Sequence, residues 1–340
     1  MRVGLYFDLR DPPPWRVGWH RVHARALETA AEADRRGVGS IWLSEHHFFE
    51  DGYLPQPLVF AAAVAARTRH ARIGTAVVLA ALRSALALAE EAAVVDVVSG
   101  GRLELGLGAG YRIPEYEAFG VDVAARFTLL EERGREVSEL LASERVTPAP
   151  IQSPLPMWIG GHGPRAARIA GRLGAGLLSL SPSLLDPYRA ALEQAGHPAD
   201  LARMAGPLSY VLCEDPERTW ATVREYAEYQ WRTYDSYAQE GRDGAVRAPD
   251  LPAVFASGQA GTHPPVRAVT VEQAAAELRA AAAAMPVQHV FIWERVAGMP
   301  DAIADRHVEL LVDHLIPELS EVPAAGPSAE RVAAQQLRSL

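Results

Sequence analysis

The chain contains 340 residues, of which 49% are apolar and 22% are charged, a composition typical of a globular protein with an ample core. Its 33 basic and 42 acidic residues give a formal net charge of -9, and no basic stretch stands out. This balance argues against a nucleic-acid or anionic-membrane partner. Because the sequence contains no lysine, a pyridoxal Schiff base, a lysine nucleophile and a P-loop are excluded. We therefore expect a small-molecule partner.

Cys213 is the only cysteine, so one chain cannot form a disulfide, a zinc ribbon or an iron–sulfur cluster from its own thiolates. The N-terminal residues contain Asp8 and lack the apolar core of a signal peptide. No run of about 18 uncharged apolar residues follows. These features predict a cytoplasmic protein without a membrane span.

Eight short apolar runs alternate with longer amphipathic stretches along the chain. The predicted strands are Arg2–Asp8, Val38–Ser44, Ala71–Leu79, Leu103–Leu107, Pro156–Gly160, Gly176–Ser181, Gly206–Cys213 and His289–Trp293. The predicted helices are Trp19–Arg36, Pro57–Arg69, Ala85–Ser99, Arg126–Ser143, Pro164–Leu173, Leu184–Gly196, Pro216–Glu240 and Val271–Ala284. Eight such repeats indicate an α/β protein with a single (β/α)8 TIM barrel, and a doubly wound open sheet is the alternative topology.

Two stretches interrupt this alternation. Residues 242–269, rich in Gly, Pro and Ala, follow the seventh predicted strand, and we predict them to be an inserted active-site lid, with a plain surface loop as the alternative. Residues 320–340 begin as a Pro- and Gly-containing linker and are predicted to form a C-terminal tail. The barrel domain is therefore expected to span residues 1–319.

Three ionisable residues, Glu45, His46 and His47, follow the second predicted strand, at the rim where barrel enzymes place catalytic groups. Histidine titrates near neutral pH, so one of the pair is a candidate for exchanging a proton with a reacting atom. Hydrogen bonding at a strand-to-loop corner is the structural alternative. Neither an HExxH motif nor cysteine ligands support zinc, so we predict no metal. Two other histidine pairs are predicted to lie on solvated helix faces: His20 with His23, and His307 with His314.

A glycine-rich segment follows the fourth predicted strand. Its alternating glycines, Gly106, Gly108 and Gly110, would let the backbone approach a flat ligand where a Cβ atom would collide. Tyr111 stands where the dinucleotide fingerprint needs its third glycine, so this segment is not that fingerprint. Service in ordinary turns is the alternative for these glycines.

A second glycine-rich segment, Trp158–Pro164, ends the fifth predicted strand and opens a helix. Free N–H groups at a helix N-terminus attract anions, and the glycines at 160, 161 and 163 would allow a phosphate to come close. Arg126 and Arg165 are candidate bidentate partners for it. A helix entry without a ligand is the alternative. Together, the histidines and the two glycine segments at one rim indicate a phosphorylated aromatic cofactor.

The sequence resembles the bacterial-luciferase-like flavin-dependent oxidoreductases from Arg2 to about Leu319. The motifs that carry the resemblance are Ser44-Glu-His-His-Phe48, Arg72-Ile-Gly-Thr-Ala-Val77, Leu88-Ala-Glu-Glu-Ala92, the stretch Asp96–Tyr111 and Trp158-Ile-Gly-Gly161. The resemblance implies a TIM barrel that holds reduced FMN, reacts it with O₂ to a C4a-(hydro)peroxyflavin and oxygenates a small organic substrate. It also implies a separate flavin reductase and a homodimer or higher homo-oligomer.

The resemblance further implies roles for individual residues. His46 matches a histidine assigned to proton transfer, with Glu45 and His47 beside it, and Ala76-Val77 matches a non-prolyl cis peptide under the flavin ring. The implied cofactor-binding residues are Ala76, Val77, Gly106, Gly108, Ala109, Gly110, Tyr111, Arg126, Trp158, Gly160, Gly161, His162 and Gly163. The candidate substrate or lid residues are Tyr229, Tyr234 and Phe255, with aromatic helix packing as the alternative for the tyrosines.

One departure from the family pattern concerns the phosphate. Many relatives carry an arginine where this chain has Ala109, so the anion must rely on Arg126, the helix end or another group. We therefore expect low affinity for oxidised FMN. Two alternatives to the monooxygenase hypothesis stay open. One is hydride transfer with the deazaflavin F420, which the same superfamily uses, and the other is a non-catalytic flavin-binding protein.

Overall fold

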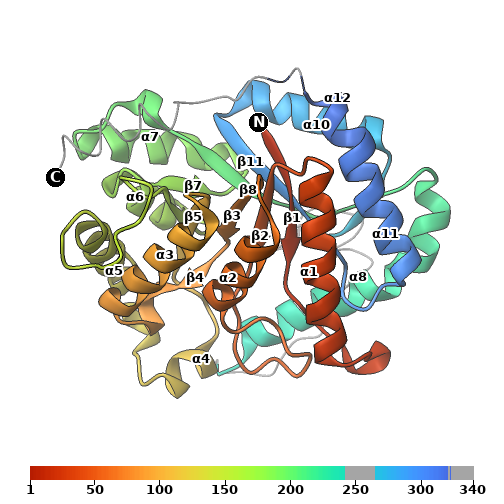
Figure 1. Ribbon diagram of the computed structural model, residues 1–340, viewed down its shortest axis with the longest axis horizontal. Coiled ribbons are helices and arrows are strands. Elements are labelled where there is room, and N and C mark those ends of the chain that lie inside the picture. The colour runs from red at the N-terminus through yellow and green to blue at the C-terminus, as the bar shows by residue number, and fades with distance from the viewer. Residues whose placement is uncertain (242–264, 321, 323–340) are drawn as a thin grey trace.

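Parallel strands form a closed barrel in the computed structural model, which describes residues 1–241, 265–320 and 322 (Figure 1). Its strands are β1 (Arg2–Phe7), β2 (Ser40–Leu43), β3 (Arg72–Thr75), β4 (Val78–Leu79), β5 (Leu103–Gly108), β6 (Met157–Gly160), β7 (Gly176–Leu178), β8 (Met204–Leu208) and β11 (Val287–Trp293). They hydrogen-bond in the order β3-β2-β1-β11-β8-β7-β6-β5-β4, and a β3–β5 pairing closes the ring. The prediction of a (β/α)8 TIM barrel is confirmed.

Helices surround the barrel on its outer face (Figure 1). The longer ones are α1 (Trp19–Arg35), α2 (Pro57–Arg67), α3 (Ala85–Ser99), α5 (Arg126–Leu141), α6 (Pro164–Arg172), α7 (Leu185–Gln194), α8 (Pro216–Gln239), α10 (Val271–Ala284) and α11 (Asp301–Leu310). Two short helices are α4 (Ile113–Ala118) and α12 (Ile316–Glu318), and a π turn spans Leu311–Leu315. The 3₁₀ turns are Pro13–Trp15, Ala80–Leu82, Val123–Ala125, Pro182–Leu184 and Ala199–Leu201. Neither α4 nor α11 was among the predicted helices.

Two of the predicted strands are interrupted. The run 71–79 divides into β3 and β4 at a cis peptide bond between Ala76 and Val77. The run 206–213 divides at Ser209, because β9 (Tyr210–Leu212) leaves the barrel and pairs in parallel with β10 (Arg267–Val269). The predicted lid at 242–269 is therefore wrong for residues 267–269, which form a strand. Residues 242–264, including Phe255, and most of the predicted tail lie outside the described residues.

Two indole rings fill the barrel interior. Trp42 stacks on Phe291 with ring centroids 4.6 Å apart, and Trp158 meets Trp42 edge to face at 6.3 Å. A Cβ atom added at Gly74 would overlap the Trp42 ring, and one at Gly176 would overlap the Trp158 ring. These glycines on the neighbouring strands thus create the space that the indoles occupy.

His307 corrects a prediction. It was expected on a solvated helix face, yet it is fully buried between the barrel and β9. Its Nδ1 accepts a hydrogen bond from the Leu212 N–H (2.8 Å), and its Nε2 donates to the Trp293 carbonyl (2.9 Å). Its predicted partner on that face, His314, is exposed as expected. The helical spacing of the pair could not reveal that α11 turns one histidine inward.

Acidification is expected to destabilise the protein through His307. Burial lowers the pKa of His307 to about 4, whereas an unfolded histidine titrates near 6.5. Between these values the unfolded chain binds a proton that the folded chain does not bind. The free energy of unfolding therefore falls as the pH drops from about 6.5 to about 4, by on the order of 3 kcal/mol for this group. His289, whose pKa burial also lowers to about 4, adds a loss of the same sign.

Urea unfolding of the wild type and of His307→Gln at pH 7 and pH 5 measures this effect. The variant is expected to lose less stability between the two pH values, because it lacks one of the titrating groups. Asp8, whose pKa burial raises to about 7, contributes with the opposite sign in both proteins and cancels in the comparison. Equal losses in the two proteins would contradict the prediction.

Candidate active site

His46 lies at the C-terminal rim of the barrel, just after β2, and its side chain is 9% exposed. Its ring stacks on Phe49 with centroids 4.6 Å apart and meets the edge of Tyr53 at 4.8 Å. Its Nδ1 lies 3.0 Å from Glu115 Oε1, and its Nε2 lies 3.3 Å from the Tyr111 hydroxyl. Because a carboxylate accepts at Nδ1, the neutral ring carries its proton there and presents Nε2 as an acceptor.

Glu115 is a site residue that the sequence reasoning missed. It lies in α4, is fully buried, and its Oε1 also accepts the backbone N–H of His47 at 2.8 Å. Its Oε2 is buried without a hydrogen-bond partner in the described part of the chain. The carboxylate therefore fixes both the ring orientation of His46 and the path of the loop that carries it. Its place four residues after Tyr111, among helix-forming residues, was the one available signal.

Glu45 and His47 are turned toward a different set of partners. His47 Nε2 lies 2.9 Å from Glu45 Oε1, which also accepts from Arg83 at 3.1 Å. The other carboxylate oxygen of Glu45 accepts the backbone N–H of Leu79 at 3.0 Å. Both side chains thus tie the loop after β2 to β4. This arrangement argues against the catalytic roles predicted for them.

The predicted cis peptide under the site is present at Ala76–Val77, and the Ala76 carbonyl accepts a hydrogen bond from the Tyr6 hydroxyl. The reason for the neighbouring glycines differs from the predicted one. A Cβ atom at Gly108 or Gly160 would overlap the Val77 side chain, and one at Gly106 would overlap the Thr75 carbonyl. These three glycines make room for the protein's own β3–β4 segment. A contact of their backbone with a cofactor stays a prediction.

The variant Gly106→Ala is expected to lower the free energy of unfolding by roughly 1–3 kcal/mol, because its methyl group would be forced against backbone rather than a flexible side chain. Gly163→Ala is the matched control, since a Cβ atom there meets no other atom within 4 Å and its φ of -134° suits alanine. Urea denaturation of both variants measures the difference. Equal stability of the two variants would refute the packing role of Gly106.

The predicted phosphate-binding segment lies at the start of α6. Gly163 precedes Pro164 at the first helical position, and the space beside the Gly163 Cα is open. The guanidinium carbons of Arg126 and Arg165 lie 4.8 and 4.6 Å from the ring centroid of Phe127, so α5 and α6 bring both arginines to one place. His162, predicted beside them, is exposed. Two cations at a helix N-terminus suit a phosphate.

The Trp158 side chain does not lie at the start of α6. It is buried in the barrel interior, and its indole N–H donates to Glu104 Oε2 at 2.7 Å. The guanidinium of Arg203 lies 5.4 Å from its ring centroid. A side chain so completely enclosed by the barrel core cannot reach a ligand at the rim. The Trp158 side chain therefore packs the barrel core, and a cofactor contact of its backbone stays a prediction.

The segment after β5 is arranged by backbone and ring contacts. Gly110 has a φ of +66°, a left-handed conformation that glycine adopts without strain. The carbonyl of Ala109 accepts a hydrogen bond from Tyr116 of α4. Burial raises the pKa of Tyr111, which therefore keeps its hydroxyl proton at neutral pH. These contacts aim Tyr111 at His46.

A second unpredicted feature is a buried ion pair next to His46. Arg10 Nε donates to Asp51 Oδ2 at 2.6 Å, and both side chains are at most 1% exposed. The Arg10 guanidinium lies 5.5–5.7 Å from the rings of three tyrosines, which are Tyr53, Tyr229 and Tyr234. The hydroxyls of Tyr53 and Tyr234 lie 2.9 Å apart. Of the two α8 tyrosines predicted as substrate or lid residues, Tyr234 lies beside His46, with ring centroids 6.2 Å apart, and Tyr229 lies beside Arg10 and Trp15.

Two absences complete the description of residues 1–241, 265–320 and 322. Within these ranges, no group of three or more His, Cys, Asp or Glu side chains is placed to hold a metal ion. A search of the same residues for a helix both long and apolar enough to cross a membrane found none.

The family described as luciferase-like monooxygenase matches residues 4–313, so the chain belongs to this family. It is 29% identical over 247 residues to an F420-dependent glucose-6-phosphate dehydrogenase of Kineococcus radiotolerans, covering 62% of this chain and 72% of that protein. It is 30% identical over 166 residues to the oxygenase component of the flavin-dependent trigonelline monooxygenase of Acinetobacter baylyi, covering 44% and 46%. It is 36% identical to the uncharacterized protein y4wF of Sinorhizobium fredii, of whose length the chain spans 53%.

Solved structures share the fold. Monooxygenase RslO1 from Streptomyces bottropensis superposes with a TM-score of 0.77 at 24% identity, covering 93% of this chain and 99% of that one. The oxygenating constituent of 3,6-diketocamphane monooxygenase from Pseudomonas putida, solved with FMN, gives a TM-score of 0.67 at 18% identity, covering 93% and 98%. These likenesses support the barrel architecture.

Proposed function

We propose that the protein is an oxidoreductase, a monooxygenase that uses reduced FMN and O₂ to oxygenate a small organic substrate. The observation that carries the proposal is the placement of His46 between Glu115 and Tyr111 at the barrel mouth. Family membership supports flavin or deazaflavin chemistry. The trigonelline relative is named an oxygenase component, which supports a separate reductase as the source of reduced flavin.

The rim has groups that suit the two ends of FMN. Arg126, Arg165 and the N–H groups at the start of α6 would hold the phosphate, beside the open space at Gly163. The segment Gly108–Tyr111 and the Ala76–Val77 peptide would face the ring. When bound, reduced FMN supplies the electrons that activate O₂ for insertion into the substrate.

The protein's own contribution to the chemistry is proton control at His46. Glu115 holds the Nδ1 proton, so Nε2 is the atom that accepts a proton or returns it. The Tyr111 hydroxyl, which burial keeps protonated, donates toward Nε2 and holds the ring in place. The rings of Phe49, Tyr53 and Tyr234 surround the imidazole and restrict water around it.

Anaerobic calorimetric titration with reduced FMN and reduced riboflavin tests the cofactor assignment, because riboflavin lacks the phosphate. Reduced FMN is expected to bind about tenfold or more tightly than riboflavin, from charge-assisted hydrogen bonds to the arginines. The double variant Arg126→Gln/Arg165→Gln is expected to remove that difference. A preference for FMN that survives in the double variant would contradict the proposed phosphate site.

The two alternative functions, an F420-dependent dehydrogenase and a non-catalytic flavin carrier, predict different results in binding and O₂-consumption assays. An F420-dependent dehydrogenase would bind F420 and reduce it with an alcohol substrate, and would not consume O₂ with reduced FMN. The F420-dependent relative makes this the second candidate. A non-catalytic flavin carrier would bind reduced FMN, yet O₂ uptake with NADH and a flavin reductase would yield no oxygenated product.

A further inference from the structure

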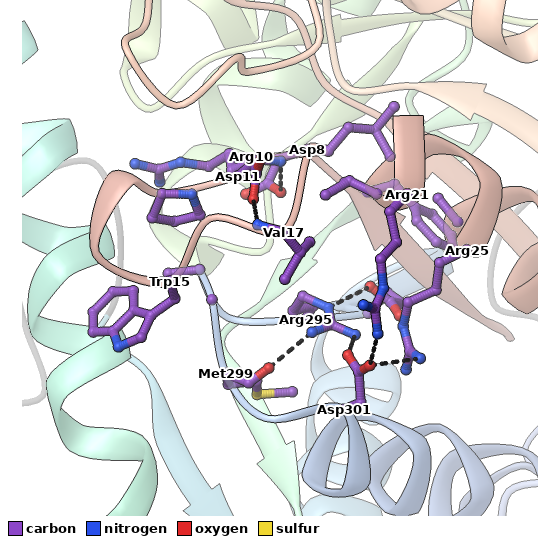
Figure 2. A pocket seen from close by; sticks show the side chains of 18 of the residues that line it. Asp8, Arg10, Asp11, Trp15, Val17, Arg21, Arg25, Arg295, Met299 and Asp301 are labelled. Atoms are coloured by element: carbon purple, nitrogen blue, oxygen red, sulfur yellow. Dashed lines mark hydrogen bonds and ion pairs between the residues drawn. The ribbon is translucent and has the colours of Figure 1, made fainter. Parts of the chain in front are cut away.

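A cavity of about 210 Å³ lies between the segment after β1 and the loop that joins β11 to α11 (Figure 2). It is at the same rim as His46, but among the described residues neither His46 nor Arg126 lines it. Apolar side chains form much of its wall, among them Leu9, Trp15, Val22 and Met299. An apolar cavity of about 150 Å³ accepts benzene, so this one has room for a ring with a few substituent atoms.

Four buried polar atoms on residues that line the cavity have no hydrogen-bond partner in the described part of the chain: Asp8 Oδ2, Arg10 Nη1, Arg10 Nη2 and Arg25 Nε. Asp8 points into the cavity from the wall opposite Arg295 and Asp301 (Figure 2). Its Oδ1 accepts the backbone N–H of Arg10 at 3.3 Å, whereas its Oδ2 is buried and has no partner within the described part of the chain. Burial raises the pKa of Asp8 to about 7, so near neutrality the carboxyl both donates and accepts. A buried oxygen of this kind calls for a hydrogen-bonding ligand.

The charges around the cavity lie next to opposite charges, although Arg10 Nη1 and Nη2 make no hydrogen bond within the described residues. The arginines in its wall are bound to carboxylates: Arg10 to Asp51, Arg25 to Asp305, and Arg21 and Arg295 to Asp301. The Asp11 carboxylate accepts the N–H groups of Val17 and Gly18. Glu294, whose pKa burial raises, lies 3.7 Å from the Arg295 guanidinium. An ionic ligand therefore meets no uncompensated opposite charge.

We propose that this cavity binds a small uncharged ring compound carrying one hydroxyl or carbonyl group, which hydrogen-bonds to Asp8 Oδ2. The cavity adjoins the reaction site through Tyr6, which lines it and whose hydroxyl donates to the carbonyl of the cis Ala76–Val77 peptide. As a statement of substrate class, this inference rests on the proposed function. The binding itself requires no flavin.

The test is calorimetric titration of the flavin-free full chain with four probes of similar size: phenol, toluene, benzoate and benzylamine. Phenol is expected to bind about tenfold more tightly than toluene, the worth of one hydrogen bond, and more tightly than either ion. Asp8→Leu is expected to bring the phenol-to-toluene ratio close to one. Asp8→Asn, which keeps a hydrogen-bonding group, is expected to retain the preference. Circular dichroism establishes that each variant is folded.

A second variant tests the cavity without altering Asp8. Val17 lies at the cavity wall and is half exposed, so Val17→Trp is expected to narrow the space and weaken phenol and toluene alike, about tenfold. Glu214→Gln is the control and is expected to leave both affinities unchanged, because Glu214 pairs with Arg306 at the surface and neither residue lines the cavity.

The proposal is overturned if no probe binds the wild type, if toluene matches phenol, if an ion binds more tightly, or if Asp8→Leu keeps the phenol preference. An ordered water that stays on Asp8 Oδ2 in a crystal soaked with phenol would overturn it as well. If phenol binds as expected while reduced FMN does not bind, the cavity site stands and the proposed function fails.

Discussion

A His46→Gln variant is expected to lose oxygenase turnover by on the order of 100-fold or more while binding reduced FMN as the wild type does. Glutamine keeps the size and polarity of the side chain but cannot accept and return a proton at the position of Nε2. The measurement is product formation, in the presence of NADH and a flavin reductase, with a ring alcohol or ketone that the wild type converts. Flavin binding is measured separately by anaerobic titration.

His47→Gln is the matched control, since the two histidines are adjacent and equally buried. Because His47 pairs with Glu45 and faces away from the site, its variant is expected to keep most of the turnover. It should instead lose about 1–3 kcal/mol of stability, because the hydrogen bond between His47 and the Glu45 carboxylate is disrupted. Equal losses of turnover in the two variants would refute the distinct role assigned to His46.

Replacing Glu104 by Leu is expected to lower the free energy of unfolding by about 3–5 kcal/mol, the usual result of removing one partner from a buried ion pair. Glu104 accepts from Arg72 Nε and from the Trp158 indole, both at 2.7 Å, near the amino ends of the strands. Burial alone would raise the pKa of Glu104, but Arg72, His289 and the indole N–H of Trp158 together hold that pKa below its usual value. The carboxylate is therefore ionised and needed by both partners.

Urea denaturation measures this loss. Glu214→Gln is the control, because Glu214 pairs with Arg306 at the exposed surface and such pairs contribute little. It is expected to leave the unfolding midpoint unchanged. If Glu104→Leu were as stable as the wild type, the buried network would be replaceable by simple apolar packing, and its stabilising role would be refuted.

The barrel could be predicted from the sequence because each of its strands is buried on both faces and appears as a short apolar run. The interruptions within two of the predicted strands could not be predicted. The residue types of Ala76 and Val77 do not indicate that the peptide bond between them is cis. The departure of β9 from the barrel depends on pairing with β10, more than fifty residues further on, which no local pattern encodes.

The candidate site could also be predicted only in part, because local sequence shows which residues follow a strand but not which side chains meet in space. His46 could be found because it directly follows a strand, where barrels expose functional groups. Neighbouring residue types could not show that His47 turns toward Glu45, or that Glu115 joins the site from α4. Arg10 and Asp51 were missed because 41 residues separate two side chains that only the folded loops bring together. The glycines of β5 and β6 were noticed in the sequence, but the packing of the Val77 side chain against them could not be predicted.

The indole rings inside the barrel also constrain how its sequence can diverge. Trp42 lies over Gly74, and Trp158 lies over Gly176, each ring occupying the volume that a methyl group on the adjacent strand would need. Enlarging the glycine alone would cause a steric clash, and shrinking the tryptophan alone would leave a cavity. A descendant that enlarges residue 74 must shrink residue 42 in the same step, so the two positions are expected to drift as linked pairs through evolutionary time.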